Sequence, residues 1–214
     1  MNVQDDGSLH VIILAAGRSL RFGSAKLAAP VGGQAMLKVV ASRATALAGH
    51  AVTVVLGARA GELAPLLRNL PASMVVNRDF MEGIASSIRA GLAQVPAVAD
   101  GALILLADQA AVTTDDLRRL ANCWRQQPGM IVAAQYKGAT GVPVIFPREL
   151  FGELLLLRGD RGARNLLARH ADRVLRVPMP SAAHDVDTPV DLEGLPPLSP
   201  APERDSGPPG TTRT

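Results

Sequence analysis

Short apolar runs alternate along the chain with segments in which apolar residues recur at helical spacing. Residues 10–15 and 102–107 form nearly continuous apolar runs that end abruptly at Gly or Asp, and residues 51–56 and 130–134 follow the same pattern. Runs of this kind are typical of parallel strands that are buried on both faces. The pattern therefore predicts buried strands at these four places.

Three other segments predict amphipathic helices. Gly49 is placed to end the first helix, while Thr113 and Asp116 form a capping-box-like start of the third. The apolar stripes are Met36, Val40, Ala44 and Leu47; Ile84, Ile88, Leu92 and Val95; and Leu117, Leu120, Ala121 and Trp124. Strands that alternate with helices predict an α/β fold, with a Rossmann-like open, mostly parallel sheet, helices on both faces, and ligands beyond the carboxyl ends of the strands.

The composition is that of one domain followed by a polar tail. Of the 214 residues 48% are hydrophobic and only 3% aromatic, so the core has to be built from Ala, Val, Leu and Ile. Residues 196–214 are rich in Pro, Gly, Ser and Thr, which bury too little apolar surface to offset chain entropy. We expect a single domain over residues 1–195 and a disordered tail over residues 196–214.

Hydropathy, cysteine content and charge indicate where the protein is located in the cell and which classes of partner it binds. The chain has no apolar run near the roughly 18 residues that span a bilayer, no signal-peptide pattern, and one cysteine, Cys123, which we expect to have a packing role. We expect a cytoplasmic protein with no membrane partner. The net charge is +3, but scattered basic residues with few aromatic neighbours argue against a nucleic-acid partner. A mild positive charge also suits small polyanions such as triphosphates.

The segment after the first predicted strand, residues 14–26 (LAAGRSLRFGSAK), has the composition of a phosphate-binding loop. Small residues expose backbone N–H groups to phosphate oxygens, while Arg21 and Lys26 add positive charge. The loop has neither the G-x-G-x-x-G of dinucleotide-binding folds nor the Gly-Lys-Ser/Thr of Walker loops. The alternative is an ordinary connection, with Gly for the turn and Lys for solubility.

This loop resembles the signature loop of the MobA-like nucleotidyltransferases, which attach CMP or GMP to molybdopterin. The resemblance implies a fold of the nucleotide-diphospho-sugar transferase type. It also implies that Lys26 contacts the triphosphate, with Arg21 as a second cation, and that the loop holds the nucleotide at Leu14, Ala15, Ala16 and Gly17. Ala16 indicates CTP, because the cytidylyltransferases of the family resemble Leu-Ala-Ala-Gly and the guanylyltransferases Leu-Ala-Gly-Gly. Packing of Ala16 beneath the loop is the alternative.

A second motif, residues 77–92 (NRDFMEGIASSIRAGL), contains the start of the second predicted helix. Small hydroxyl residues at a helix start commonly satisfy free N–H groups, so capping is one interpretation. In the resembled family the corresponding stretch lines the base and ribose of the nucleotide. The resemblance implies that role for Asn77, Gly83, Ser86 and Ser87.

Asp108 directly follows residues 102–107, so it lies at the carboxyl end of a predicted central strand, where open α/β sheets bind ligands. Its carboxylate is a hard oxygen ligand that suits Mg²⁺. Capping of the following turn is the alternative, although the next helix is predicted to begin only at Thr113. The family usually has Asp-Met-Pro or Asp-Gln-Pro here, whereas this chain has Ala110 in place of Pro.

A further carboxylate comes from residues 184–192 (HDVDTPVDL). Thr188 and Pro189 are explained as the cap and first residue of a helix, but this does not explain Asp187. In the matching family motif this position is the second metal ligand. The resemblance therefore implies that Asp108 and Asp187 hold Mg²⁺ together with phosphate oxygens and water.

Residues 141–146 (GVPVIF) and 157–167 (LRGDRGARNLL) resemble the acceptor half of the cytidylyltransferase branch. The resemblance implies that Arg161 and Arg164 hold the phosphate or pterin of the acceptor, while Asp160 is also a plausible helix cap. Relatives often have His where this chain has Val142. The resemblance spans residues 10–192, with five motifs in family order.

Taken together, the resemblance implies a Mg²⁺-dependent molybdenum cofactor cytidylyltransferase. It would move CMP from CTP to the terminal phosphate of molybdopterin and release pyrophosphate, with an apo-molybdoenzyme as a candidate client. A GTP-using enzyme, or one with another acceptor, is an alternative within the same fold. Two alternatives come from other classes: a non-catalytic protein that delivers the pterin cofactor, and an oxidoreductase that holds NAD(P)H at the same place.

Overall fold

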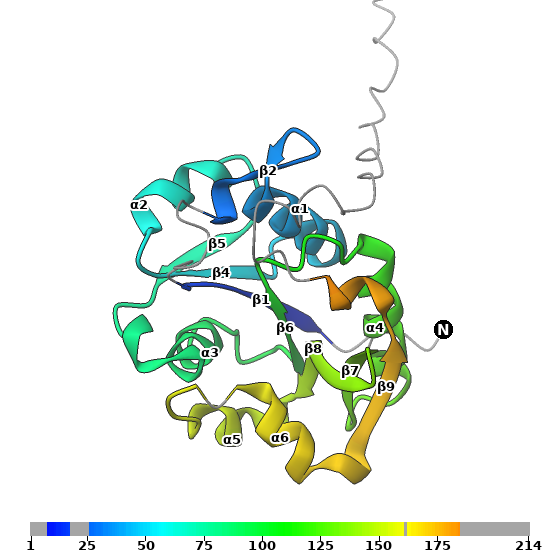
Figure 1. The fold of residues 1–214 in the computed structure, drawn as a ribbon. Coiled ribbons are helices and arrows are strands. Elements are labelled where there is room, and N and C mark those ends of the chain that lie inside the picture. Colours follow the sequence, from blue (N-terminus) through cyan, green and yellow to red (C-terminus); the bar gives the residue numbers. More distant parts are fainter. Residues whose placement is uncertain (1–7, 18–25, 161, 185–214) are drawn as a thin grey trace, which may run out of the picture.

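The structure is a computed structural model that describes residues 8–17, 26–160 and 162–184. Within these ranges a seven-stranded sheet carries helices on both faces (Figure 1). The strands of this sheet are β1 Leu9–Ala15, β4 Val52–Leu56, β5 Ser73–Val76, β6 Gly101–Leu106, β7 Ile131–Tyr136, β8 Ala139–Pro147 and β9 Val174–Pro178. The short strands β2 Pro30–Val31 and β3 Gln34–Ala35 pair separately.

The connections are helical. The α-helices of the described residues are α1 Met36–Ala48, α2 Ala60–Leu63, α3 Ile84–Leu92, α4 Thr114–Gln126, α5 Phe151–Leu155 and α6 Ala163–Arg169. Single 3₁₀ turns lie at η1 Lys26–Ala28, η2 Ala64–Leu67, η3 Phe80–Glu82, η4 Arg148–Leu150, η5 Ala171–Arg173 and η6 Pro180–Ala183. None of the helices described has both the length and the apolar character needed to cross a membrane.

The strand order is β5-β4-β1-β6-β8-β7-β9. Strand β8 runs antiparallel to β6 and β7, whereas the other neighbouring pairs are parallel. This confirms the predicted open, mostly parallel sheet with helices on both faces. In such a sheet the residues that follow neighbouring parallel strands meet at one edge, which is where ligands bind in this fold class.

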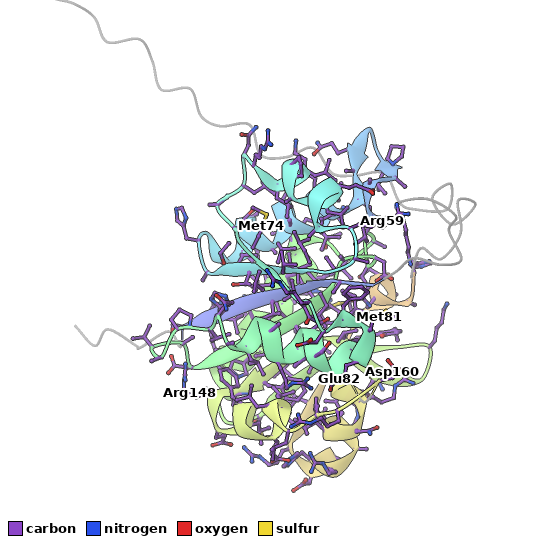
Figure 2. All side chains as sticks on the ribbon, turned by 90° about the vertical axis from the view of Figure 1, so that its left-hand side faces the viewer. Arg59, Met74, Met81, Glu82, Arg148 and Asp160 are labelled. Atoms are coloured by element: carbon purple, nitrogen blue, oxygen red, sulfur yellow. The ribbon has the colours of Figure 1, made fainter. Side chains whose placement is uncertain are left out.

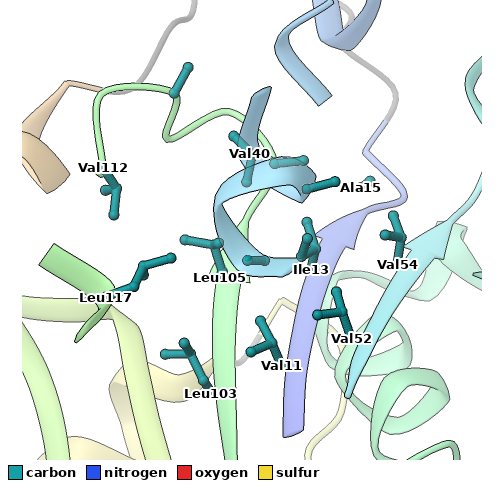
Figure 3. Packing of buried hydrophobic residues seen from close by; sticks show 14 of the residues in the cluster. Val11, Ile13, Ala15, Val40, Val52, Val54, Leu103, Leu105, Val112 and Leu117 are labelled. Atoms are coloured by element: carbon teal, nitrogen blue, oxygen red, sulfur yellow. The ribbon is translucent and has the colours of Figure 1, made fainter. Parts of the chain in front are cut away.

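Each face of the sheet has its own apolar core, because side chains alternate between the faces along a strand. Val11, Ile13 and Ala15 of β1 pack with α1 and α4, as Figure 3 shows. Ile12 and Leu14 of the same strand belong to the core on the other face, which is covered by α3, α5 and α6, the helices below the sheet in Figure 1. Burial on both faces explains why β1 is continuously apolar.

The four strands and three helices predicted from the pattern are all present, within one or two residues at their starts. Gly49 ends α1 with a φ of 56° and donates its N–H to Thr45 O. Thr113 and Asp116 form the predicted capping box of α4. Cys123 of α4 is partly buried against the core, as expected for a packing role.

Strands β5, β8 and β9 are not predicted by the apolar pattern. Three of the four residues of β5 are exposed at the edge of the sheet. In β9 only Val174 is buried, and the residues after it are half-buried or exposed. Strand β8 contains Gly141 and Pro143, which interrupt the apolar run that marks a buried strand. The helix start predicted at Thr188 and the tail of residues 196–214 lie outside the described residues.

A row of hydrogen-bonded polar side chains runs from the buried strands β1 and β4 to the edge strand β5. His10 Nε2 lies 2.9 Å from Thr53 Oγ1, which lies 2.9 Å from Ser73 Oγ, and this hydroxyl donates to Val52 O. His10 is only 5% exposed, and its buried Nδ1 has no hydrogen-bond partner among the described residues. Burial lowers the pKa of His10 below its ordinary value of 6.5, because the charged imidazolium is poorly solvated there.

We therefore predict that the protein loses stability as the pH falls below about 6.5. Below this pH His10 binds a proton in the unfolded chain but not in the folded protein, so protonation favours unfolding. The contribution of His10 to the free energy of unfolding is therefore complete above its ordinary pKa and is lost as the pH falls toward its lower pKa in the folded state. Urea unfolding of wild type and His10→Gln between pH 8 and pH 5 measures this difference. We expect a smaller loss in His10→Gln, which cannot titrate at this position, whereas the exposed His50→Gln should behave as wild type. Parallel pH profiles for wild type and His10→Gln would contradict the prediction.

Candidate functional site

Strand β1 brings three separate segments of the chain together at the carboxyl edge of the sheet. It pairs in parallel with β4, where Ala15 is opposite Leu56, and with β6, where Leu14 is opposite Leu106. The residues that follow these strands, Ala16, Gly57 and Asp108, are therefore drawn to one edge. Ala16, at the start of the glycine loop, and Asp108 therefore lie at the same edge of the sheet.

Ala16 is buried at this edge, with 5% of its surface exposed, and its methyl group belongs to the core on the α3 side. Gly57 lies directly against it. A Cβ atom on Gly57 would approach Ala16 O to 2.5 Å and Ala16 Cα to 2.8 Å. These contacts are those expected if Ala16 packs beneath the loop. The next residue, Gly17, is exposed and has no atom within 4 Å of the place where a Cβ would lie.

Lys26 and Asp108 form an ion pair, although they are 82 residues apart in the sequence. Lys26 begins η1, and its Nζ donates to Asp108 Oδ2 at 2.9 Å. The lysine side chain is 9% exposed and the aspartate side chain 28%. A nearly buried ammonium requires such a partner, because an unpaired charge loses much of its hydration in the interior.

The second carboxylate oxygen of Asp108, Oδ1, has a different environment from Oδ2. Oδ1 is buried and accepts no hydrogen bond among the described residues. Asp108 therefore does not cap the following turn. A buried carboxylate oxygen without a donor is the kind of atom that a divalent cation coordinates, so Asp108 fits the predicted role of metal ligand.

One carboxylate does not make a metal site by itself. Among residues 8–17, 26–160 and 162–184, no group of three His, Cys, Asp or Glu side chains lies close enough to hold a metal ion. Arg21 and Asp187, the other predicted contributors to catalysis, lie outside the described residues, as does Arg161.

Asn77 organises the segment that follows β5. Its backbone N–H donates to Leu56 O at 2.8 Å, and its side chain donates to Ser86 Oγ at 2.8 Å and Ser87 Oγ at 3.1 Å. Asn77, Ser86 and Ser87 are all at most 5% exposed. The sequence motif therefore acts as one hydrogen-bonded unit that joins the loop after β5 to the first turn of α3.

The serines do not cap α3. The N-cap residue is Gly83, and Ser86 donates its hydroxyl to Gly83 O at 2.8 Å instead of accepting from a free N–H. Gly83 has a φ of 113°, a conformation that L-amino acids with a Cβ rarely adopt. The start of α3 is thus shaped by glycine geometry, and its first N–H groups are not covered by an N-cap side chain.

The predicted acceptor segment packs against this same helix start. Ala85 N donates to Gly159 O at 3.1 Å, and Arg89 donates to Leu157 O at 2.7 Å and to Glu82 Oε2 at 2.5 Å. A Cβ on Gly83 would approach Asp160 Oδ1 to 2.5 Å. Figure 2 shows Glu82 and Asp160 close together on this face. The hydrogen bond from Arg89 holds the pKa of the Glu82 carboxyl below its usual range.

The interpretation of Asp160 as a helix cap is wrong. Helix α6 begins at Ala163, and its N-cap residue is Gly162. Arg164 lies on α6 and is exposed. The structure thus places Gly159, in the segment before α6, beside the nucleotide motif, where its carbonyl accepts from Ala85 N.

Two residues that the pattern did not single out hold the loop after Asp108. Arg43 of α1 donates to Ala110 O and, at 2.8 Å, to Val112 O. Gln109 donates to carbonyls of two other segments. The only sequence signal is that each is a polar residue among apolar neighbours, and this signal does not tell which carbonyls they reach.

The chain is similar to proteins of one known family over most of its length. A family model described as the MobA-like NTP transferase domain matches residues 11–174, which include Lys26, Asn77 and Asp108. Purine catabolism protein PucB of Bacillus subtilis (strain 168) is 30% identical over 195 residues, covering 85% of this chain and 93% of PucB. Nicotine blue oxidoreductase of Paenarthrobacter nicotinovorans is 30% identical over 165 residues, covering 73% of this chain and 79% of that protein.

Among solved structures, Rv0371c of Mycobacterium tuberculosis H37Rv in complex with manganese has a TM-score of 0.72 and 29% sequence identity. The match covers 88% of this chain and 97% of that chain.

The contact between Gly57 and Ala16 predicts a stability effect. Gly57→Ala places a methyl group against the backbone of Ala16, which cannot move aside without disturbing β1, so we expect the free energy of unfolding to fall by about 1–3 kcal/mol. Urea unfolding measures this loss. The matched control is Gly61→Ala, because Gly61 lies in α2 with nothing within 4 Å of an added Cβ and should leave stability unchanged or slightly raised. Equal stability of Gly57→Ala and wild type would show that the loop yields easily.

Proposed function

The chain belongs to the MobA-like NTP transferase family, and from this premise we propose that it transfers CMP from CTP to the terminal phosphate of molybdopterin and releases pyrophosphate. The observation that carries the proposal is the ion pair between Lys26 and Asp108. The resemblance assigns these two residues to the triphosphate and to the metal ion, which are neighbours in any nucleotidyl transfer. Their contact at the carboxyl edge of the sheet supports that assignment.

The chemical step needs no protein nucleophile. The terminal phosphate of the acceptor attacks the α-phosphorus in line, an oxygen–phosphorus bond forms, and the bond to the leaving pyrophosphate breaks. A phosphate is already ionised at neutral pH, so no general base is assigned. The protein therefore contributes position and compensating charge.

Each proposed residue has one task in this mechanism. Lys26 binds the triphosphate with its ammonium group, and Arg21 adds a second cation. Residues Leu14, Ala15, Ala16 and Gly17 place backbone groups against the nucleotide, while Asn77, Gly83, Ser86 and Ser87 shape the pocket for base and ribose. Because the serine and asparagine side chains bond to one another, they act chiefly by fixing the first turn of α3. Arg161 and Arg164 hold the acceptor.

The metal ion of the proposal is Mg²⁺, held by Asp108 Oδ1 and by Asp187. When bound, the cation supplies positive charge that stabilises the phosphoryl oxygens and the leaving pyrophosphate. The unpaired Oδ1 fits this role. The manganese complex of Rv0371c supports a divalent cation in this fold.

A second candidate function is favoured by one comparison. Nicotine blue oxidoreductase, which is named for a redox reaction, is 30% identical over 73% of this chain. The proposal therefore competes with an oxidoreductase that holds NAD(P)H at this edge, and also with a protein that only delivers the pterin cofactor. Thermal unfolding with CTP and Mg²⁺, with GTP and Mg²⁺, and with NADPH distinguishes the nucleotidyltransferase from the oxidoreductase. A ligand at 100 times its Kd raises the free energy of unfolding by about 2.7 kcal/mol, so the nucleotide that binds raises the thermal midpoint. Release of pyrophosphate over many turnovers excludes delivery alone.

We expect substitutions of Asp108 and of Lys26 to impair different steps of the reaction. Asp108→Asn keeps the size of the side chain and an oxygen for Lys26, so the fold should persist while Mg²⁺-dependent turnover falls by about 100-fold or more. Lys26→Met should weaken CTP binding more than acceptor binding. Pyrophosphate release and calorimetric titration measure these effects, with the exposed Asp172→Asn of η5 as the control. Near-native turnover of Asp108→Asn would remove it from the metal site.

The proposed nucleotide is CTP, and Ala16 is the residue on which this choice rests. Because its methyl group lies in the core, Ala16 acts on the base by restricting the backbone at the loop, which Gly would free to approach a purine. We expect wild type to have a higher kcat/KM with CTP than with GTP, and Ala16→Gly to bring the two values closer together. Equal kcat/KM values of wild type for CTP and GTP would contradict the cytidylyltransferase assignment, but they would remain consistent with a nucleotidyltransferase.

A further inference from the structure

Gln109 is a buried amide that connects three segments of the chain around Asp108. It is 1% exposed, and its Nε2 donates to Val142 O of β8 at 3.1 Å and to Ala182 O of η6 at 3.2 Å. A primary amide carries two hydrogens, so both are used. The reverse orientation would place Oε1 against two carbonyl oxygens, so these acceptors determine which way the amide points.

The backbone around Gln109 is held as firmly as its side chain. Gln109 N donates to Leu106 O, and Val112 N donates to Gln109 O at 3.1 Å. From the other side of the loop, Arg43 donates to the carbonyls of Ala110 and Val112. These bonds oppose the freedom that Ala110 gives to a position at which the resembled family usually has the more rigid Pro.

The position of this loop matters because Asp108 is the residue next to Gln109. A Mg²⁺ ligand has to lie within a narrow range of about 2.0–2.1 Å from the ion. An error of about 1 Å in the placement of a reacting group can reduce a rate by about 100-fold. Val142 lies at the start of the predicted acceptor segment, so the amide of Gln109 also sets the distance between Asp108 and the acceptor strand β8.

We propose that Gln109 is a positioning residue, which holds the carboxylate of Asp108 in register with β8 so that metal binding and the chemical step depend on it. The inference rests on the proposed function, since it concerns the same metal site. Gln109 touches neither metal nor substrate in this role. Binding of CTP without metal, which involves Lys26 and the glycine loop, does not depend on it.

The test compares wild type with Gln109→Met, a side chain of similar length that donates no hydrogen bond. The probe is Mn²⁺ alone, measured by the paramagnetic resonance signal of the free ion. We expect the Kd for Mn²⁺ to rise by about 10-fold to 100-fold, as is typical when a residue that orients a metal ligand is lost. The kcat with CTP should fall as well, while the Kd for CTP without metal stays that of wild type. Gln126→Met, at the exposed end of α4, is the matched control and should change none of these.

A purely structural role predicts a different result. The thermal midpoint would fall while the Kd for Mn²⁺ and the kcat of the folded protein stay those of wild type, and this outcome overturns the proposal. If Gln109→Met does not fold, Gln109→Asn is measured by the same criteria, because it keeps the amide but is too short to reach both carbonyls. The wild-type arm reports on the proposed function separately. If wild type neither binds Mn²⁺ nor turns over any nucleoside triphosphate, the proposed function fails, and the positioning role falls with it.

Discussion

The parallel pairing of β1 with β4 on one side and β6 on the other is the constraint on which the site depends. It makes three strands end at one level, so the loops after them share a single edge. Ala16 can then pack on Gly57, and Lys26 can reach Asp108. If β1 lay at the edge of the sheet, one of these two contacts could not form, because one of the two neighbouring loops would be missing.

The polar groups at this edge are held by partners that are distant in the sequence. Lys26 pairs with Asp108, Asn77 bonds to Ser86 and Ser87, and Gln109 reaches Val142 and Ala182. Buried polar groups of this kind lose hydration, and they persist in a fold only when such bonds compensate. The same bonds keep the groups in place before a ligand arrives, which lowers the reorganisation needed during a reaction. Within the part of the chain that the structure describes, Asp108 Oδ1 and Gln109 Oε1 have no such partner. Of these two atoms only Asp108 Oδ1 belongs to a carboxylate, which is the stronger ligand for a divalent cation.

The relatives of this chain show that the fold alone does not determine the reaction. Proteins named for purine catabolism and for nicotine blue oxidation both match most of its length at 30% identity. A shared α/β sheet with a common binding edge can serve different chemistries when side chains at that edge change. The proposal of cytidylyl transfer therefore rests on particular residues, namely the pairing of Lys26 with Asp108 and the Ala at position 16. The absence of a dinucleotide fingerprint after β1 weighs against the redox alternative.

The sequence by itself determined the parts of this protein that depend on local pattern. Continuous apolar runs identified β1, β4, β6 and β7, and caps such as Thr113 located the start of α4, because burial on two faces and free N–H groups each require particular residue types nearby. Strand β5 was not predicted, because an exposed edge strand needs no apolar run. The cap assigned to Asp160 was wrong, because the N-cap of α6 lies two residues further on, at Gly162. Only the tertiary structure decided that Ser86 and Ser87 accept hydrogen bonds from Asn77 and that the methyl group of Ala16 lies in the core. The same is true of the hydrogen bonds from Gln109 to two other segments. These contacts join residues brought together by strand order, and no local pattern specifies which distant carbonyl or hydroxyl a buried polar side chain will meet.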